Sequence, residues 1–146
     1  MVKWWRTHCP FGQLLSLRAM QREEFEALVA RAIDNLPPEF QGRLENVDIV
    51  VEDWPSTRQL RQARQRHHNQ LLGLYQGVPQ TRRGRGYGLV LPDKISIFQK
   101  PIEAQCRFSG EIEARIEEVV RHEIAHHFGL DEKTLRSIEG EKRRWK

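Results

Sequence analysis

Apolar side chains recur every three or four positions in the first quarter of the chain. This spacing predicts a helix from about Ser16 to Asn35, because one face of an α-helix gathers residues that are three and four apart. Two prolines, Pro37 and Pro38, should end the helix, since proline lacks the N–H that the next helical hydrogen bond needs. The apolar stripe consists of Phe25, Leu28, Val29, Ala32, Ile33 and Leu36.

Three shorter apolar runs have the composition of β-strands. Residues 46–53, NVDIVVED, are rich in β-branched side chains, and residues 71–79 and 94–98 contain similar runs. A glycine-rich segment, residues 81–88, separates the last two runs and predicts a turn or loop. We therefore expect helices combined with a small sheet, in a single domain that spans residues 1–146 with a core from about 16 to 140.

The strongest helical pattern lies near the C-terminal end of the chain. It predicts a helix from about Ser109 to Phe128, with Ser109 as the N-cap and Gly129 as the residue that ends it. A shorter helix is expected to follow, from about Asp131 to Glu139. The apolar stripe of the long helix consists of Ile112, Ile116, Val119, Val120 and Ile124.

The composition is that of a globular chain, with 38% hydrophobic and 30% charged residues. No stretch approaches the roughly 18 apolar residues of a membrane-spanning helix, and the first residues lack the apolar run of a signal peptide. We therefore expect a cytoplasmic protein with no membrane partner. Two cysteines, Cys9 and Cys106, are too few for a disulfide framework.

The distribution of charge is more informative than the net charge of +4, because no carboxylate occurs between Asp53 and Asp93. Within this interval, Ser56 and Thr57 are placed to cap a short basic helix over about Arg58 to His68. Such a block predicts either a positive field for an anionic partner, nucleic acid or an acidic protein, or simply a solvated helix face and a loop. The arginines of the interval are Arg58, Arg61, Arg64, Arg66, Arg82, Arg83 and Arg85.

Residues 121–132, RHEIAHHFGLDE, contain three histidines close to acidic residues. His122 and His126 are four residues apart, so on a helix they project from the same face and can bind one Zn²⁺. Glu123 is offset from His122 by about 100° around the helix axis. It is therefore better placed to reach a water molecule beside the metal than to bind the metal, which is the general-base position of H-E-x-x-H hydrolases.

A catalytic zinc site normally takes three protein ligands, so a further ligand is expected after the helix. Gly129 lets the chain reverse, and two acids then follow, Asp131 and Glu132. Either carboxylate could complete the site, and Asp131 is also a candidate to cap the next helix or to hydrogen-bond a ligand. His127 lies about 100° around the helix from His126, towards the apolar stripe, and is expected to pack.

Several segments together resemble the small bacterial zinc metallopeptidases of the minimal zincin type, which are related to metzincins. The similarity covers EEFEALVARAIDNLPPEF, NVDIVVEDWP, LLGLYQGVP, LPDKISIFQKPI and VVRHEIAHHFGLDEKTL. It implies a compact α/β domain in which a small mixed sheet packs against the motif helix. It also implies Zn²⁺ bound by His122, His126 and the acid at Glu132, with Glu123 as general base.

In zincins, an edge strand beside the cleft pairs with extended substrate, and YGLVLPDKISIF, residues 87–98, is the candidate for that strand. One departure from the metzincin pattern concerns methionine. The only methionines are Met1 and Met20, so no methionine turn lies downstream of the motif.

The leading functional hypothesis is zinc-dependent hydrolysis of peptide bonds in a peptide or protein substrate. The arginine-rich interval supports a second hypothesis, a metal-dependent nucleic-acid hydrolase or an RNA-associated factor. A third is a zinc-binding domain without catalysis, in which a protein atom fills the fourth coordination position. Tyr75, Tyr87 and Arg121 are candidates to stabilise an oxyanion.

Overall fold

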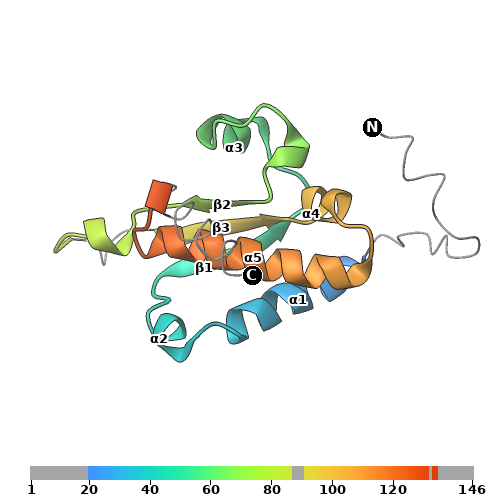
Figure 1. The fold of residues 1–146 in the computed structure, drawn as a ribbon. Helices are drawn as coiled ribbons and strands as arrows, with labels where there is room; N and C mark the ends of the chain where they lie inside the picture. The colour runs from blue at the N-terminus through green and yellow to red at the C-terminus, as the bar shows by residue number, and fades with distance from the viewer. Residues whose placement is uncertain (1–19, 87–90, 132, 135–146) are drawn as a thin grey trace, which may run out of the picture.

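A three-stranded sheet forms the centre of the fold (Figure 1). The computed structural model describes residues 20–86, 91–131 and 133–134. The strands are β1 (Val47–Glu52), β2 (Gly73–Gln76) and β3 (Asp93–Phe98), in the order β1-β3-β2. Because β1 runs parallel to β3 and β2 runs antiparallel to it, the sheet is mixed, as expected.

The position of β3 in the middle of the sheet corrects one expectation. Residues 93–98 of that candidate segment do not supply a substrate-binding edge, because β3 pairs with β1 on one side and with β2 on the other. Residues 87–90 lie outside the described ranges. The physical reason is burial: Ile95, Ile97 and Phe98 are fully buried, and such a strand belongs in the centre of a sheet. The short strand β2 is an edge strand instead.

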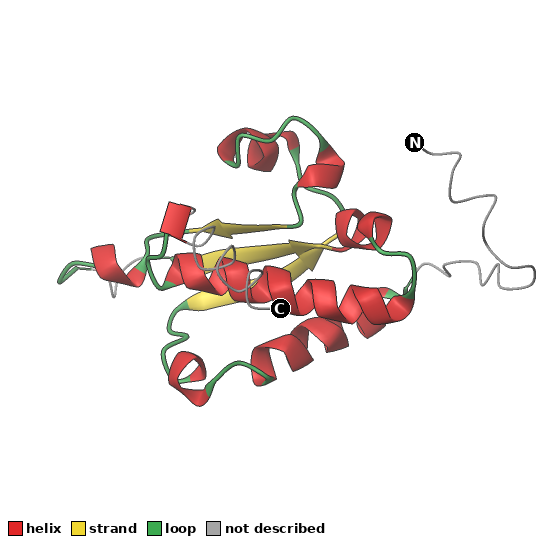
Figure 2. Ribbon diagram, in the orientation of Figure 1, coloured by secondary structure: helices red, strands yellow, loops and turns green. Residues whose placement is uncertain are grey.

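Two helices cover one face of the sheet. α1 (Arg22–Asp34) and α5 (Ser109–His127) lie side by side across it (Figures 1 and 2). The predicted packing of a small mixed sheet against the motif helix is therefore confirmed. No described helix is long and apolar enough to cross a membrane. The buried core between helices and sheet includes Phe25, Val29, Ile95, Ile97, Ile116, Val120 and Ile124.

The starts of both long helices differ from the expected ones. α1 begins at Arg22, and the backbone N–H of Gln21 donates to the Glu24 side chain at 3.4 Å. Ser109 is the first residue of α5 and not its N-cap. There, the carboxylate of Glu111 accepts from the backbone N–H of Arg107 at 2.6 Å, so an acid in the first turn replaces the expected serine cap.

Short helical elements connect the main ones. α2 (Pro38–Gln41) follows the first proline, which occupies its N-cap position. α4 (Gln99–Gln105) follows β3 and was not expected from the sequence, because its seven residues are too few to show a period clearly. The 3₁₀ turns are η1 (His68–Gln70) and η2 (Gln80–Arg82). Of the final helix expected over 131–139, residues 131, 133 and 134 are described; 133 and 134 are helical, and 131 is not.

α3 (Thr57–Gln62) is capped by Ser56 as expected but ends earlier than His68. The hydroxyl of Ser56 accepts from the backbone N–H of Gln59 at 3.2 Å. At the other end Arg64 adopts a left-handed conformation with φ 55°, and the Gln65 N–H donates to the Leu60 carbonyl at 2.9 Å. This is a Schellman turn, whose left-handed position normally holds glycine, so arginine there costs roughly 1 kcal/mol.

Candidate metal centre

His122 and His126 lie one turn apart near the C-terminal end of α5, as their spacing predicts. Their ring centroids are 5.0 Å apart, and the ring planes are inclined at 80°. Two imidazoles on one tetrahedral zinc, with Zn–N bonds of about 2.1 Å, have centroids roughly 5 Å apart. The separation therefore fits a shared zinc ion.

The turn that ends α5 also orients His126. Gly129 has φ 92°, and the Leu130 N–H donates to the Ala125 carbonyl at 3.0 Å, which closes a Schellman turn. This reversal brings the Leu130 carbonyl to 2.9 Å from Nδ1 of His126. A ring that donates from Nδ1 to a carbonyl presents Nε2 as its metal-binding atom, the arrangement found around metal-ligating histidines.

Glu123 lies on the side of α5 that faces β2 and is only 8% exposed. At this point the helix and the strand are in direct contact through Gly73. A Cβ atom on Gly73 would lie 2.7 Å from Cγ1 of Val119 and 2.9 Å from Cγ of Glu123, closer than real Cβ contacts. The glycine therefore allows the general-base candidate to sit between the helix and the edge strand.

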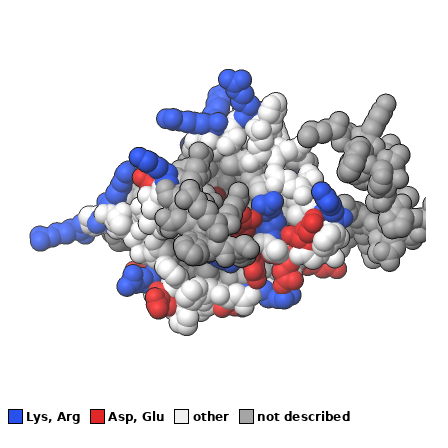
Figure 3. All heavy atoms as spheres, in the orientation of Figure 1, with Lys and Arg blue, Asp and Glu red and all other residues white. Residues whose placement is uncertain are grey.

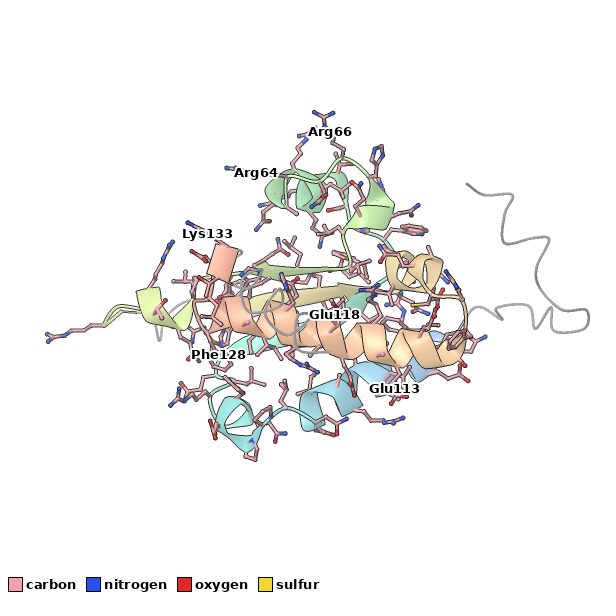
Figure 4. All side chains as sticks on the ribbon, viewed as in Figure 1. Arg64, Arg66, Glu113, Glu118, Phe128 and Lys133 are labelled. Carbon is pink, nitrogen blue, oxygen red and sulfur yellow. The ribbon has the colours of Figure 1, made fainter. Side chains whose placement is uncertain are left out.

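The side chains of His122, Glu123 and His126 line one cleft of about 530 Å³. One wall is α5, the second is the segment 70–75, which includes most of β2, and the third is Ala63 and Gln65, directly after α3. Figure 4 labels Glu118 on α5 and places Arg64 and Arg66 above it, on the segment after α3. His122 and His126 thus line a cleft that has an edge strand as one side.

The outward backbone groups of β2 can be assigned from the ladder. The N–H of Phe98 donates to the carbonyl of Leu72 at 2.9 Å, which makes 72 and 98 a hydrogen-bonded pair. In an antiparallel ladder such pairs alternate, and Leu74 opposite Ser96 is the next one. The N–H and C=O groups of Gly73 and Tyr75 consequently point away from β3, on the cleft side of the strand.

A buried acid, Asp93, ties the end of α5 to the sheet. It is 3% exposed, although it lies on the same face of β3 as Ile95 and Ile97. Its Oδ2 accepts from the Tyr75 hydroxyl at 2.5 Å, from the Arg83 guanidinium at 2.6 Å and from Nδ1 of His127 at 3.1 Å. These residues form what we call the Asp93 cluster (Tyr75, Arg83, Asp93 and His127).

His127 packs inside this cluster and is fully buried, which confirms the expectation that it packs rather than faces solvent. Burial lowers its pKa from the ordinary value, against the opposing effect of the hydrogen bond to Asp93. The ring is therefore neutral at pH 7. A tautomer that donates from Nδ1 to Asp93 leaves Nε2 to accept from the Gln80 amide, 3.2 Å away.

Sequence reasoning missed the rest of the Asp93 cluster, because its members are far apart along the chain. The available signal was the register of DKISIF, in which the acid occupies the same face as two buried isoleucines. Tyr75, a candidate for the oxyanion, instead donates to Asp93. Arg121, the second described candidate, is exposed on α5, and Tyr87 lies outside the described residues.

The third metal ligand stays a prediction. Glu132 lies outside the described residues, and among the described ones no group of three His, Cys, Asp or Glu side chains gathers around a common point. Asp131 is exposed, and its Oδ1 accepts from the backbone N–H of Thr134 at 2.8 Å. Hydrogen bonds with the Thr134 side chain and with its backbone N–H lower the pKa of Asp131, and the second gives it the capping role that the sequence offered as an alternative.

Comparison with models of known protein families gives a match over residues 44–142, to the family described as zincin-like metallopeptidase. The match covers more than half of the chain, including the three strands, the cleft and the segment 121–132. α1 lies before it. Comparison with curated proteins finds no match.

The contact at Gly73 predicts a specific effect of a single methyl group. Gly73→Ala should force α5 away from β2 and destabilise the protein by about 1–3 kcal/mol, as overpacking of a core does. Urea unfolding of the metal-free protein measures this loss. Gly84→Ala is the control, because a Cβ atom there meets nothing within 4 Å. Equal stability of the two variants would contradict the close contact.

Asp93→Ala should lower the free energy of unfolding by about 3–5 kcal/mol, since it removes a buried carboxylate that is paired with the partly buried Arg83 cation. Asp53→Ala is the matched variant, because Asp53 pairs with Arg22 at an exposed site and should cost less than about 1 kcal/mol. Thermal or urea unfolding distinguishes the two. Losses of similar size would show that the Asp93 cluster stabilises no more than a surface ion pair.

Zinc affinity separates the candidates for the third ligand. We expect Glu132→Gln to weaken zinc binding by at least about 100-fold, the upper end of the cost of losing a group that only hydrogen-bonds a metal ligand, and Asp131→Asn to weaken it much less. Competition with a chromophoric chelator gives the affinities, and His67→Ala, at an exposed histidine, is the control. A larger loss in Asp131→Asn would reverse the assignment.

Proposed function

We propose, since the chain belongs to the zincin-like metallopeptidase family, that it is a zinc-dependent peptidase with its active site in the cleft between α5 and β2. One observation carries the proposal: two histidines spaced for a shared metal and a buried glutamate line the same cleft, beside an edge strand. A site of this composition has the parts that metal-assisted hydrolysis needs.

The proposed zinc ligands are His122 and His126 through their Nε2 atoms, together with Glu132. When bound, zinc supplies a Lewis acid that polarises a scissile carbonyl and lowers the pKa of a water molecule. The chain prepares this site in advance, because the Leu130 carbonyl fixes the ring of His126. The Asp93 cluster holds the following residue, His127, and so anchors the last turn of the helix.

Glu123 is the proposed general base. It takes a proton from the attacking water and passes it to the nitrogen of the leaving amine. Its position between α5 and Gly73 supports this role. A side chain packed against a strand is held in its orientation before the proton is transferred. Its low exposure also keeps bulk water away from the carboxylate.

The edge of β2 offers a place for the substrate backbone. The outward N–H and C=O groups of Gly73 can pair with an extended peptide by β-augmentation. Gly73 is also the residue against which Glu123 packs, so a peptide aligned on it passes next to the general base. This assigns to β2 the role that the sequence suggested for residues 87–98.

Replacement of Glu123 by glutamine tests the proposal directly. The amide keeps the shape of the side chain but accepts no proton, so hydrolysis should fall by about 10²–10⁴-fold. Zinc content, measured by mass spectrometry, and thermal stability should stay close to those of the unaltered protein. Cleavage of a quenched fluorescent peptide library gives the rates.

The control for this experiment is Glu118→Gln, a second glutamate that lines the cleft but is exposed and paired with Arg115. It should retain most of the activity. Equal hydrolysis by the Glu123→Gln and Glu118→Gln variants would remove Glu123 from the mechanism, and the absence of any zinc-dependent cleavage would contradict the proposed function.

A further inference from the structure

The wall of the cleft opposite α5 carries cations that the proposed chemistry does not use. Ala63 and Gln65, which line the cleft, flank Arg64 in the chain. Arg61 and Arg66 belong to the same stretch, and all three arginines are exposed. We call them the arginine rim (Arg61, Arg64 and Arg66).

The arginine rim has no compensating acid. The chain contains no carboxylate from residue 54 to residue 92. Within the described residues, none of the three arginines forms an ion pair, whereas Arg115 inside the cleft is paired with Glu118 at 2.7 Å. Figure 4 shows Arg64 and Arg66 projecting from the upper rim into solvent, and in Figure 3 basic side chains there stand without acidic neighbours. The rim therefore places positive charge beside the cleft.

The backbone at Arg64 adds an independent observation. α3 and α5 both end in a Schellman turn, and the left-handed position holds Gly129 after α5 but Arg64 after α3. Glycine adopts this conformation without a steric penalty, and arginine does not. Backbone strain of this kind clusters at functional sites, and here it lies next to two residues of the cleft wall.

We propose that the arginine rim selects peptide substrates with acidic side chains close to the scissile bond. This inference rests on the proposed peptidase function and adds the substrate class. A peptide paired with the edge of β2 extends about 3.3 Å per residue, so side chains a few residues from the cleaved bond reach the rim. Their carboxylates pair there with guanidinium groups, which suit planar anions.

The edge strand favours a polypeptide over a nucleic acid as the anionic ligand. The cleft-side N–H and C=O groups of Gly73 match the backbone of an extended peptide, not a sugar–phosphate chain. The apolar side chains of the same wall, Leu71, Leu72 and Leu74, suit peptide side chains as well. Trp54 is 46% exposed and lies near His68. An exposed indole can stack on a nucleic-acid base, so a short RNA is included as a competing ligand in the test.

Binding to the inactive, zinc-loaded Glu123→Gln chain tests the substrate class without turnover. The probes are three fluorescein-labelled ten-residue peptides that share the same apolar central segment. They differ only in the flanking residues, which are three Glu, three Gln or three Lys on each side. Fluorescence anisotropy at about 50 mM salt should show the Glu peptide binding at least about 10-fold tighter than the Gln peptide, with the Lys peptide weakest. The preference should shrink at about 200 mM salt, because salt screens exposed charges.

Variants of the rim identify the residues responsible. Arg64→Gly should remove much of the preference for the Glu peptide while raising the urea midpoint, because glycine relieves the left-handed backbone. Arg64→Lys should keep most of the preference. Arg107→Gln is the control: Arg107 is exposed and precedes α5, roughly 20 Å along the helix from His122.

The outcomes separate this inference from the proposed function. Equal affinities for the Glu and Gln peptides, or a preference unchanged in Arg64→Gly, would overturn the inference even if the unaltered enzyme cleaves both. The inference would also be overturned if a ten-nucleotide RNA bound more tightly than the Glu peptide and this binding depended on the arginine rim. A preference for the Glu peptide that depends on the arginine rim supports the inference. If the unaltered protein shows this preference but cleaves no peptide, only the proposed function is contradicted.

Discussion

The close approach of α5 to β2 at Gly73 is the constraint on which the candidate site depends. Helix and strand meet where a single methyl group would collide with Val119 and Glu123. This contact puts a glutamate of the helix beside the backbone edge of the sheet, and it directs the two histidines of the same helix into the cleft. A larger separation would place the general-base candidate away from any peptide aligned on β2.

The Asp93 cluster holds the end of α5 in this position. A carboxylate on the core face of a sheet is costly to bury, and here it accepts from donors on β2, on α5 and on the segment after η2. The hydrogen bonds join the elements that must stay in register for the cleft to keep its shape. The polar residues in the core thus stabilise the geometry around the proposed ligands, while the apolar stripes of α1 and α5 supply most of the buried surface.

The sequence predicts the elements whose pattern is local. The helix over 109–128, the strands around 46–53 and 94–98 and the turn at Gly129 follow from periodicity and cap chemistry. The pairing order of the strands depends on contacts between distant residues, so β3 was wrongly expected at an edge. The Asp93 cluster joins residues 75, 83, 93 and 127, and the conformation of Arg64 contradicts local preference, so neither has a local signature. The spacing H-E-x-x-H indicates His122, Glu123 and His126, but the choice between Glu132 and Asp131 needs the path of the chain after Gly129.

A crystal structure of the zinc-loaded protein tests the central claim most directly. We expect zinc about 2.0–2.1 Å from Nε2 of both His122 and His126, a carboxylate oxygen as third ligand, and a solvent molecule in the open position within hydrogen-bond distance of Glu123. Zinc bound elsewhere on the chain would contradict the account. A fourth position closed by a protein atom would make the metal structural and would contradict it equally.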